Sequence, residues 1–271
     1  MSGTQRERGR PLVVELVGPP GAGKSTLLPE VVDACRATGR CPATTIDAAR
    51  RLARRTLPGR LVSALPAIRT RDRLLWAVFL VTSALAGLAR LPPTWPLAWR
   101  VARSQLRRPP DAEAAQRRVW RWFRRLVGTH GLFLARAAPH EVLVLDEGFV
   151  HRVVQLFTSA VEVPDREAVV AYLEVVPVPD LVIAVHAPAE VCSARIRSRG
   201  VWGRFEGRDG DDLDRFVANA HRATAIAVEY ARTRDWPLIE IDNATNGAGV
   251  DVAALHRDVA NGLGSPAGAA P

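Results

Sequence analysis

The stretch Val13–Thr26 reads VVELVGPPGAGKST and contains the only lysine of the 271-residue chain, Lys24. The chain has 37 basic residues, and all the others are arginines. A glycine-rich turn, Gly18–Ser25, follows an apolar run directly and precedes a segment that is compatible with a helix. Its residues fit the spacing G-x-x-x-x-G-K-S without a mismatch.

This spacing predicts a loop that binds phosphate groups. Glycines let the chain curl so that successive backbone N–H groups point inward at phosphate oxygens, and the N-terminus of the following helix adds partial positive charge. We expect Lys24 to reach the β- and γ-phosphates and Ser25 to ligate Mg²⁺. Lysine is a compact point charge on a thin stem, whereas the planar guanidinium of arginine does not enter so tight a ring in the same way. The predicted ATP-binding residues are Gly18, Gly21, Ala22, Gly23, Lys24, Ser25 and Thr26.

Short apolar runs along the chain predict the strands of a single sheet. Runs such as VLVL and LVIAV are continuous rather than alternating, which is typical of parallel strands that are covered on both faces. Strands that alternate with helical segments favour an α/β fold with right-handed crossovers. We predict a five-stranded parallel sheet with strands Leu12–Val17, Ala43–Ile46, Val142–Leu145, Leu181–Val185 and Leu238–Ile241.

A strongly basic segment, predicted to be helical, interrupts this alternation. Residues 48–140 contain 19 arginines and three acidic residues, a net charge of +16, whereas the rest of the chain carries −7. Leu74–Ala89 is a run of 16 uncharged residues, and a membrane span needs about 20. The helix RRVWRWFRRLV presents one basic face, formed by Arg117, Arg121, Arg124 and Arg125. Two interpretations stay open: helices packed on the rest of the protein, or binding of an anionic membrane surface or polyanion through residues 74–125.

The chain divides into three parts on these patterns. We predict a core made of residues 1–47 and 140–250, a helical insertion at 48–139, and a helix remnant with a flexible tail at 251–271. The start MSGTQRERGRP lacks the apolar centre of a secretory signal. The three cysteines show neither disulfide nor metal spacing. We therefore expect a cytoplasmic protein and leave membrane association open.

Carboxylates follow two of the predicted strands. Asp146, in VLVLDEG, stands at the end of an apolar strand, where it can hold Mg²⁺ directly or through water. Glu147 is a second candidate for the same neighbourhood. Asp47, in TTIDAAR, can accept the proton of a hydroxyl nucleophile during phosphate transfer, and it is equally suited to cap the next helix.

These motifs together resemble P-loop nucleoside and nucleotide kinases, in particular thymidylate kinases. GPPGAGKST is similar to the loop of adenylate kinases, and AEVCSARIRSRGVWGRFEG, residues 189–207, resembles the mobile lid of the family. The resemblance covers the predicted core and implies the three-layer fold of P-loop NTPases. It implies that three lid residues, Arg195, Arg199 and Arg204, stabilise the charge of the transferred phosphoryl group. It also implies that the loop around adenine begins at IDN, which makes Asn243 a nucleotide-binding residue.

The sequence departs from these families on the acceptor side. Thymidylate kinases carry Asp-Arg after the third strand, whereas Asp146 is followed here by Glu147 and Gly148, and Arg152 is offset by six residues. The insertion at 48–139 also replaces the part of the family's fold that forms the acceptor pocket.

We predict an ATP-dependent kinase that transfers the γ-phosphate of Mg·ATP to a hydroxyl of a small molecule. Its predicted catalytic residues are Lys24, Asp47, Asp146, Arg195, Arg199 and Arg204, and its predicted metal ligands are Ser25 and Asp146. Two alternatives stay open: a nucleoside monophosphate kinase, and an NTP-dependent regulatory protein that binds a membrane or a polyanion. Nucleic-acid binding is not favoured, because the sequence has no recognisable module for it. A homodimer is left open.

Overall fold

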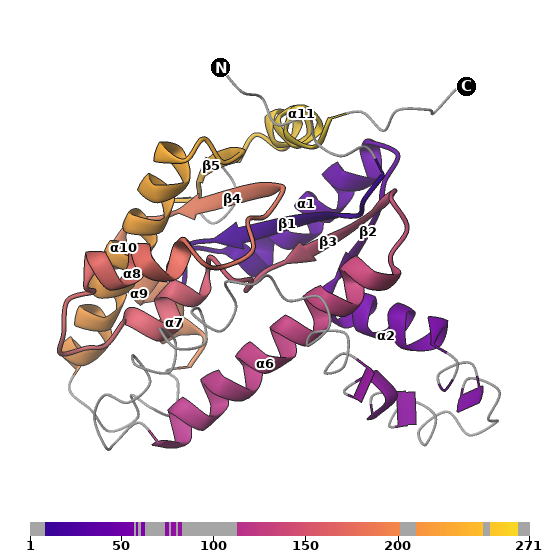
Figure 1. Ribbon diagram of the computed structural model, residues 1–271. Coiled ribbons are helices and arrows are strands. Elements are labelled where there is room, and N and C mark those ends of the chain that lie inside the picture. The colour runs from indigo at the N-terminus through magenta and orange to yellow at the C-terminus, as the bar shows by residue number, and fades with distance from the viewer. Residues whose placement is uncertain are drawn as a thin grey trace.

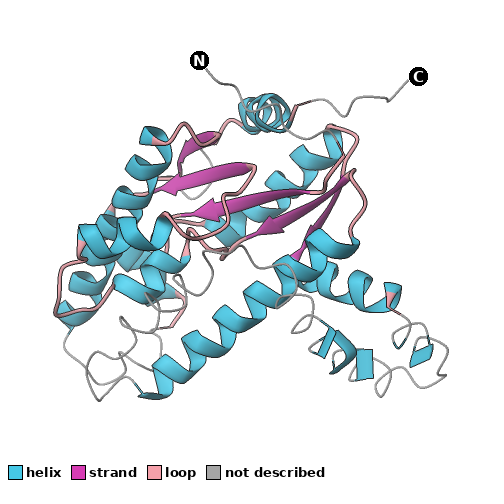
Figure 2. Ribbon diagram, in the orientation of Figure 1, coloured by secondary structure: helices cyan, strands magenta, loops and turns pink. Residues whose placement is uncertain are grey.

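The computed structural model describes residues 9–56, 113–200, 210–245 and 250–264, with a few single positions between 57 and 82. Within these residues the strands form one sheet in the order β2-β3-β1-β4-β5, and every neighbouring pair is parallel (Figures 1 and 2). The strands are β1 Leu12–Val17, β2 Cys41–Thr44, β3 Glu141–Leu145, β4 Leu181–His186 and β5 Leu238–Asp242. The predicted α/β class and five-stranded parallel sheet are therefore confirmed.

The second strand is the one whose predicted position is wrong. We predicted Ala43–Ile46, but β2 ends at Thr44 and helix α2, Thr45–Arg55, begins at the next residue. The Thr44 hydroxyl donates a hydrogen bond to the Asp47 carboxylate at 2.8 Å. A threonine followed three residues later by an acidic residue is typical of a helix start, and Thr44 is the N-cap residue of α2.

Helices cover both faces of the sheet, as Figure 1 shows. On one face lie α1 Lys24–Ala37, α9 Ala189–Ser198 and α11 Val252–Leu263. On the other lie α2, α6 Glu113–Arg136, α7 Arg152–Phe157 and α8 Arg166–Leu173. The long helix α10, Gly210–Thr233, contributes apolar side chains to both cores. The described part of the chain thus forms a helix–sheet–helix sandwich in which each face of the sheet has its own core.

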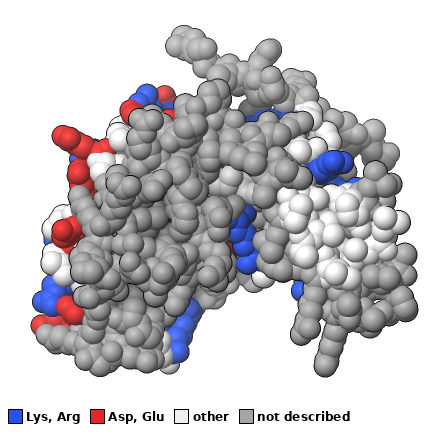
Figure 3. Space-filling model, turned by 60° about the horizontal axis from the view of Figure 1, so that its bottom comes forward, with Lys and Arg blue, Asp and Glu red and all other residues white. Residues whose placement is uncertain are grey.

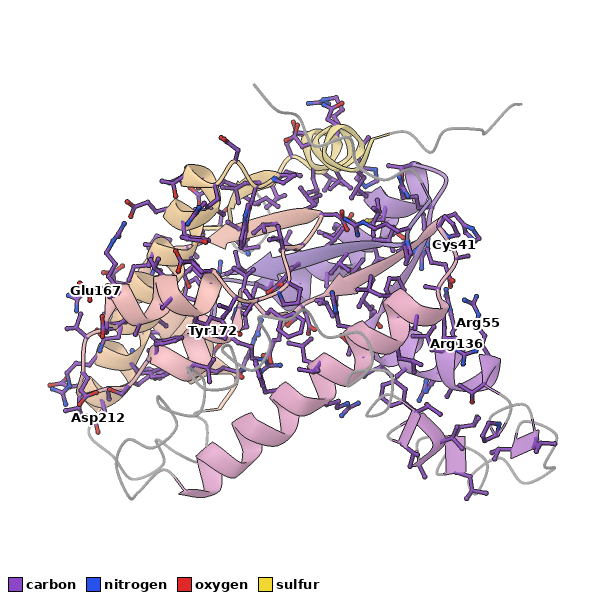
Figure 4. All side chains as sticks on the ribbon, viewed as in Figure 1. Cys41, Arg55, Arg136, Glu167, Tyr172 and Asp212 are labelled. Carbon is purple, nitrogen blue, oxygen red and sulfur yellow. The ribbon has the colours of Figure 1, made fainter. Side chains whose placement is uncertain are left out.

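Both described ends of the predicted insertion belong to one of these cores. Leu52 of α2 and Phe133 of α6 are each 1% exposed and lie in the same cluster as the strands. The Arg55 guanidinium binds the Glu141 carboxylate at the start of β3 and the Arg136 carbonyl at 3.3 Å, and Figure 4 shows Arg55 beside Arg136. The ion pair links α2 to β3 and the hydrogen bond links α2 to α6, so both helices belong to the core on this face of the sheet.

The segment proposed to bind membranes falls mostly outside the described residues, which include only a few positions of Leu74–Ala89. Across the described ranges, no helix is both long and apolar enough to cross a bilayer. On the face in Figure 3, acidic side chains gather along the left margin, and the visible Lys and Arg side chains form separate patches. The described surface in this view therefore shows no continuous basic area.

The helix predicted as a C-terminal remnant is a component of the core. The Asp251 carboxylate accepts a hydrogen bond from the Ala254 backbone N–H at 2.9 Å and so caps α11. The inward residues of this helix are buried against α1 and the sheet; they are Leu255, Val259 and Leu263. Residues 265–271, the predicted tail, lie outside the described residues.

Replacing Leu255 by alanine tests this role of α11. Leu255 is 3% exposed, so Leu255→Ala should lower the free energy of unfolding by about 2–5 kcal/mol through lost burial and a cavity. The control is Val252→Ala on the same helix, where the side chain is 41% exposed and the expected change is below about 1 kcal/mol. Urea denaturation measures both, and equal small losses would show that α11 does not stabilise the fold.

Candidate functional site

The glycine loop, residues 18–25, connects β1 to α1, and neighbouring backbone approaches it closely. A Cβ atom added at Gly18 would lie 2.5 Å from the Val185 carbonyl oxygen, and one at Gly21 would lie 2.5 Å from the Cys192 carbonyl oxygen. Gly21 and Gly23 have φ angles of +83° and +94°, which side-chain-bearing residues rarely adopt. Gly23 is the N-cap residue of α1. The conformation and the space both require glycine at these positions.

Lys24 turns its ammonium group back onto its own loop. Nζ donates hydrogen bonds to the carbonyl oxygens of Gly18 at 2.8 Å and Pro19 at 3.1 Å. Burial lowers the pKa of Lys24 to about 8, although the negative charges of Glu147 and Asp146 oppose this shift. The ammonium group that we predicted to contact phosphates is thus a partly desolvated cation held by two backbone carbonyls.

The candidate metal ligands Ser25 and Asp146 belong to adjacent parts of the sheet's carboxyl edge. Ser25 is exposed in the first turn of α1, beside the exposed Thr26, while Ala22 of the loop is buried. Asp146 follows β3 directly, and the pairing of Glu15 with Leu145 puts β3 alongside β1. Among the described residues, no three His, Cys, Asp or Glu side chains form a metal cage. A hydroxyl and one carboxylate fit Mg²⁺, which commonly takes one or two protein ligands and completes its shell with phosphate and water oxygens.

Arg195 and Asn243 lie against the glycine loop rather than free above it. The Arg195 guanidinium donates to the carbonyl oxygens of Gly21 at 3.1 Å and Asn243 at 2.8 Å. The Asn243 side-chain amide is 2% exposed and donates to the Ala22 carbonyl at 2.8 Å. Both side chains therefore bind the backbone of the loop, which the predicted roles in a mobile lid and at adenine did not anticipate.

The other predicted site residues are less constrained. Arg199 is the exposed C-cap residue of α9, and Arg204 lies outside the described residues. Asp47 is exposed in the first turn of α2, which follows the edge strand β2. With β3 between β2 and β1, Asp47 stands on the far side of Asp146 from the glycine loop. This position suits contact with a second molecule beyond the phosphates.

An open cavity of about 470 Å³ lies at the carboxyl ends of β4 and β5. It is lined by His186, Ala187, Pro188, Glu240 and Asp242. The imidazole Nε2 of His186 lies 3.0 Å from a Glu240 carboxylate oxygen, and the backbone N–H of Asn243 donates to the His186 carbonyl at 2.7 Å. Of its two carboxylates, Glu240 is paired with the Arg232 guanidinium at 2.7 Å.

Glu15 is a prominent site residue that we did not predict. It is 1% exposed in the middle of the central strand, and its carboxylate accepts a hydrogen bond from the His151 backbone N–H at 2.7 Å. Burial raises the pKa of Glu15 to about 8, against the effect of backbone N–H groups and of the Arg152 charge. The sequence signal that could have identified Glu15 is a charged residue in an otherwise apolar strand.

Two further polar side chains surround this carboxylate. Arg152 is 3% exposed; its guanidinium binds Gln155, donates to the Glu147 carbonyl at 3.2 Å and lies 3.5 Å from the Glu147 carboxylate. Burial, together with the charges of Lys24 and Arg152, holds the pKa of His151 well below its usual value, so its ring is neutral. The Nε of Arg152 and the Nδ1 of His151 are buried without a hydrogen-bond partner. Such atoms are uncommon in folded proteins.

The chain matches no protein-family model and no curated protein. The resemblance to P-loop kinases therefore stays a prediction from the sequence motifs, and the residues of the site carry the argument for function.

Glu15→Gln should remove part of the pH dependence of stability. In the folded protein Glu15 keeps its proton up to a pKa of about 8, whereas its ordinary value is 4.5. Its contribution to stability is therefore complete below pH 4.5 and is lost as the pH rises to about 8, by up to about 1.4 kcal/mol per pH unit. Glutamine does not titrate, so the variant should lose this slope.

The measurement is the free energy of unfolding at several pH values between 5 and 8, compared between the variant and the unaltered protein. Because the buried histidines are present in both proteins, the difference between the two curves reports the contribution of Glu15. Glu190→Gln, at an exposed position, is the control and should leave the slope unchanged. Parallel curves for Glu15→Gln and the unaltered protein would contradict the assignment.

Proposed function

We propose that the protein is an ATP-dependent kinase that transfers the γ-phosphate of Mg·ATP to a hydroxyl group of a small molecule. We also propose that its sandwich is the three-layer fold of P-loop NTPases. The strand order supports this, because the glycine loop follows the central strand and Asp146 follows the strand beside it.

The single observation that carries the proposal is the environment of Lys24. An ammonium group whose pKa is lowered to about 8 by burial is costly in a protein unless it serves an anion. Its two hydrogen-bond acceptors are carbonyls of its own loop, which a phosphate oxygen can replace without moving the backbone. The N-terminus of α1 begins at the same residue and favours the same anion.

Residues of this site have distinct parts in such a transfer. When bound, Mg·ATP supplies the phosphoryl group and the metal that offsets its charge, with Ser25 and Asp146 as the protein ligands. Lys24 binds the phosphates and stabilises the charge that develops on them. Arg195 holds the glycine loop through the Gly21 carbonyl. Arg199, exposed at the end of α9, contacts the phosphates when the predicted lid closes. Asp47 accepts the proton of the attacking hydroxyl.

A phosphorylated acceptor is the second candidate, and Arg152 favours it. The sequence lacks the arginine of thymidylate kinases next to Asp146, yet the turn into α7 brings the Arg152 guanidinium to within 3.5 Å of the Glu147 carboxylate. A buried guanidinium with an unpartnered Nε, beside the predicted transfer site, is suited to a second phosphate. This arrangement supports nucleoside monophosphates as acceptors.

The decisive experiment measures ADP release from Mg·ATP with pools of nucleosides, nucleoside monophosphates, sugars and other alcohols. Release that depends on one pool supports the kinase and selects between the two acceptor classes. Slow hydrolysis that is the same with every pool would favour a regulatory NTPase instead. Flotation with anionic vesicles at increasing salt then tests the membrane-binding alternative, because binding through basic residues weakens with ionic strength.

Lys24 variants test the phosphate contact. Lys24→Ala should abolish phosphoryl transfer, at least about a thousandfold, and leave the thermal unfolding transition nearly unchanged. Lys24→Arg should fail almost as completely, because its guanidinium does not fit between the Gly18 and Pro19 carbonyls. Coupled measurement of ADP release provides the rates. Retained turnover in the alanine variant would remove Lys24 from the mechanism.

Asp47→Asn tests the assignment of the base. Turnover should fall at least about a hundredfold with little change in ATP affinity, because the residue acts on the acceptor and not on the nucleotide. Thr44→Val removes the 2.8 Å hydrogen bond to Asp47 but keeps the carboxylate, and it should retain most of the activity. Unchanged turnover in Asp47→Asn would transfer the role of base to Asp146 or Glu147.

A further inference from the structure

We infer that Glu15 is a positioning residue that fixes the loop 146–151, and with it the carboxylate of Asp146, relative to the glycine loop. The contact itself follows from the geometry of described residues. Its consequence for magnesium rests on the proposed function, in which Asp146 is a metal ligand.

The Glu15 carboxylate lies inside the turn that follows β3. It accepts the His151 backbone N–H at 2.7 Å, and the N–H groups of Val150 and Phe149 also stabilise its charge. The backbone amides of three successive residues, 149–151, therefore lower the pKa of one side chain, and that of His151 is hydrogen-bonded to it. Glu15 stands three residues before Gly18 on β1, so the carboxylate connects the strand of the glycine loop to the loop that carries Asp146.

Gly148 makes this close approach possible. A Cβ atom at position 148 would lie 2.6 Å from the Cγ of Glu15 and even closer to its carboxyl group. The backbone of the loop thus rests directly on the Glu15 side chain, and no other residue type fits at 148 while Glu15 keeps its place. The glycine after Asp146-Glu147, which interrupts the expected Asp-Arg pattern, has a physical reason in this contact.

The remaining contacts hold the outer side of the same turn. The Tyr172 hydroxyl of α8 donates to the Phe149 carbonyl at 3.0 Å, and Figure 4 shows Tyr172 beside α7. The Phe149 ring packs edge-on against His130 of α6, with 5.3 Å between the ring centroids. These partners come from helices that cover the sheet, whereas Glu15 comes from the strand that leads into the glycine loop.

A carboxyl group at this position is costly in any other role. Its neighbours on the same face of β1, Val13 and Val17, belong to the apolar core. Burying a carboxyl among such residues costs free energy unless its hydrogen bonds are satisfied, and an aliphatic residue would stabilise the strand more. Two titratable side chains interact electrostatically with Glu15. The charge of Arg152 lowers the pKa of Glu15, and the Glu15 charge raises the pKa of Tyr172. The need for an acceptor of the His151 amide explains why a carboxyl group is present, because its oxygen can accept this hydrogen bond in the protonated form as well.

The test compares Glu15→Met, which keeps the size of the side chain but cannot accept these hydrogen bonds, with Glu15→Gln, which retains one acceptor. Val13→Thr is the matched control: it also places a polar change in the buried face of β1 but does not touch the loop. Two quantities are measured on the full chain. One is amide hydrogen exchange in residues 146–157, and the other is ADP affinity with and without Mg²⁺ by calorimetry.

Glu15→Met should raise exchange at 149–151 by about tenfold or more, beyond any change in Val13→Thr, because a hydrogen-bond acceptor is lost. It should also reduce the Mg²⁺-dependent gain in ADP affinity by about tenfold while leaving metal-free affinity within about twofold, and Glu15→Gln should restore most of both. A role in stability alone would alter Glu15→Met and Val13→Thr alike and would overturn the inference.

The outcomes also separate this inference from the proposed function. If the unaltered protein binds no ADP with or without Mg²⁺, the proposed function is wrong, and hydrogen exchange alone decides whether Glu15 anchors the loop. If the protein binds Mg·ADP and Glu15→Met shows normal exchange and a normal magnesium effect, the positioning role is wrong and the kinase proposal stands. If Glu15→Met does not fold, Glu15→Gln against Gly148→Ala decides: the latter should release the loop through steric contact, and unchanged exchange there would refute the contact.

Discussion

The central place of β1 in the sheet is the constraint on which the candidate site depends. Because β1 pairs in parallel with β3 on one side and β4 on the other, the carboxyl ends of three strands lie next to one another. The glycine loop that leaves β1 is therefore enclosed by the loop after β3 and by the backbone of β4 and α9. This enclosure removes the space for side chains at Gly18 and Gly21 and leaves room for backbone amides alone.

Side-chain contacts to backbone occur on both sides of the glycine loop. On the side of β3, Glu15 binds the turn that carries Asp146. On the side of β4, Arg195 and Asn243 bind the carbonyls of Gly21 and Ala22. These residues use their hydrogen-bonding groups on the backbone, so they define the shape of the site before any ligand arrives. A site that is organised in advance loses less entropy on binding, which is the condition under which electrostatic stabilisation of a transition state is effective.

The sequence predicted the parts of this arrangement that local patterns determine. Continuous apolar runs identified the sheet, and the spacing of Gly18, Gly23 and Lys24 identified the tight loop, because each depends on residues adjacent in the chain. The end of β2 was misplaced because the apolar Ile46 suggested a strand, whereas helix α2 already begins at Thr45.

The contacts of Glu15, Arg195 and Asn243 were beyond prediction for a different reason. These contacts join residues that are 48 to 221 positions apart in the chain, as in the pairs Arg195–Asn243, Asn243–Ala22 and His151–Glu15. Such contacts arise only when the sheet is assembled. Arginine in a helix after β4 is compatible with a lid and with an anchor, and the sequence alone does not distinguish the two. The arginine-rich composition weakens this signal further.

The charges at this edge of the sheet point to an anionic ligand. Lys24 is held charged against the cost of its burial by Glu147 and Asp146, and Glu147 is at the same time the carboxylate that faces Arg152. The exposed Glu147 carboxylate thus acts electrostatically on both cations, and it lies 3.5 Å from the Arg152 guanidinium. An anion with several negative charges would complete this balance and would raise the pKa of Lys24. By linkage, binding of such an anion and retention of the Lys24 proton favour each other, and both require the glycine loop to keep the shape that its neighbours impose.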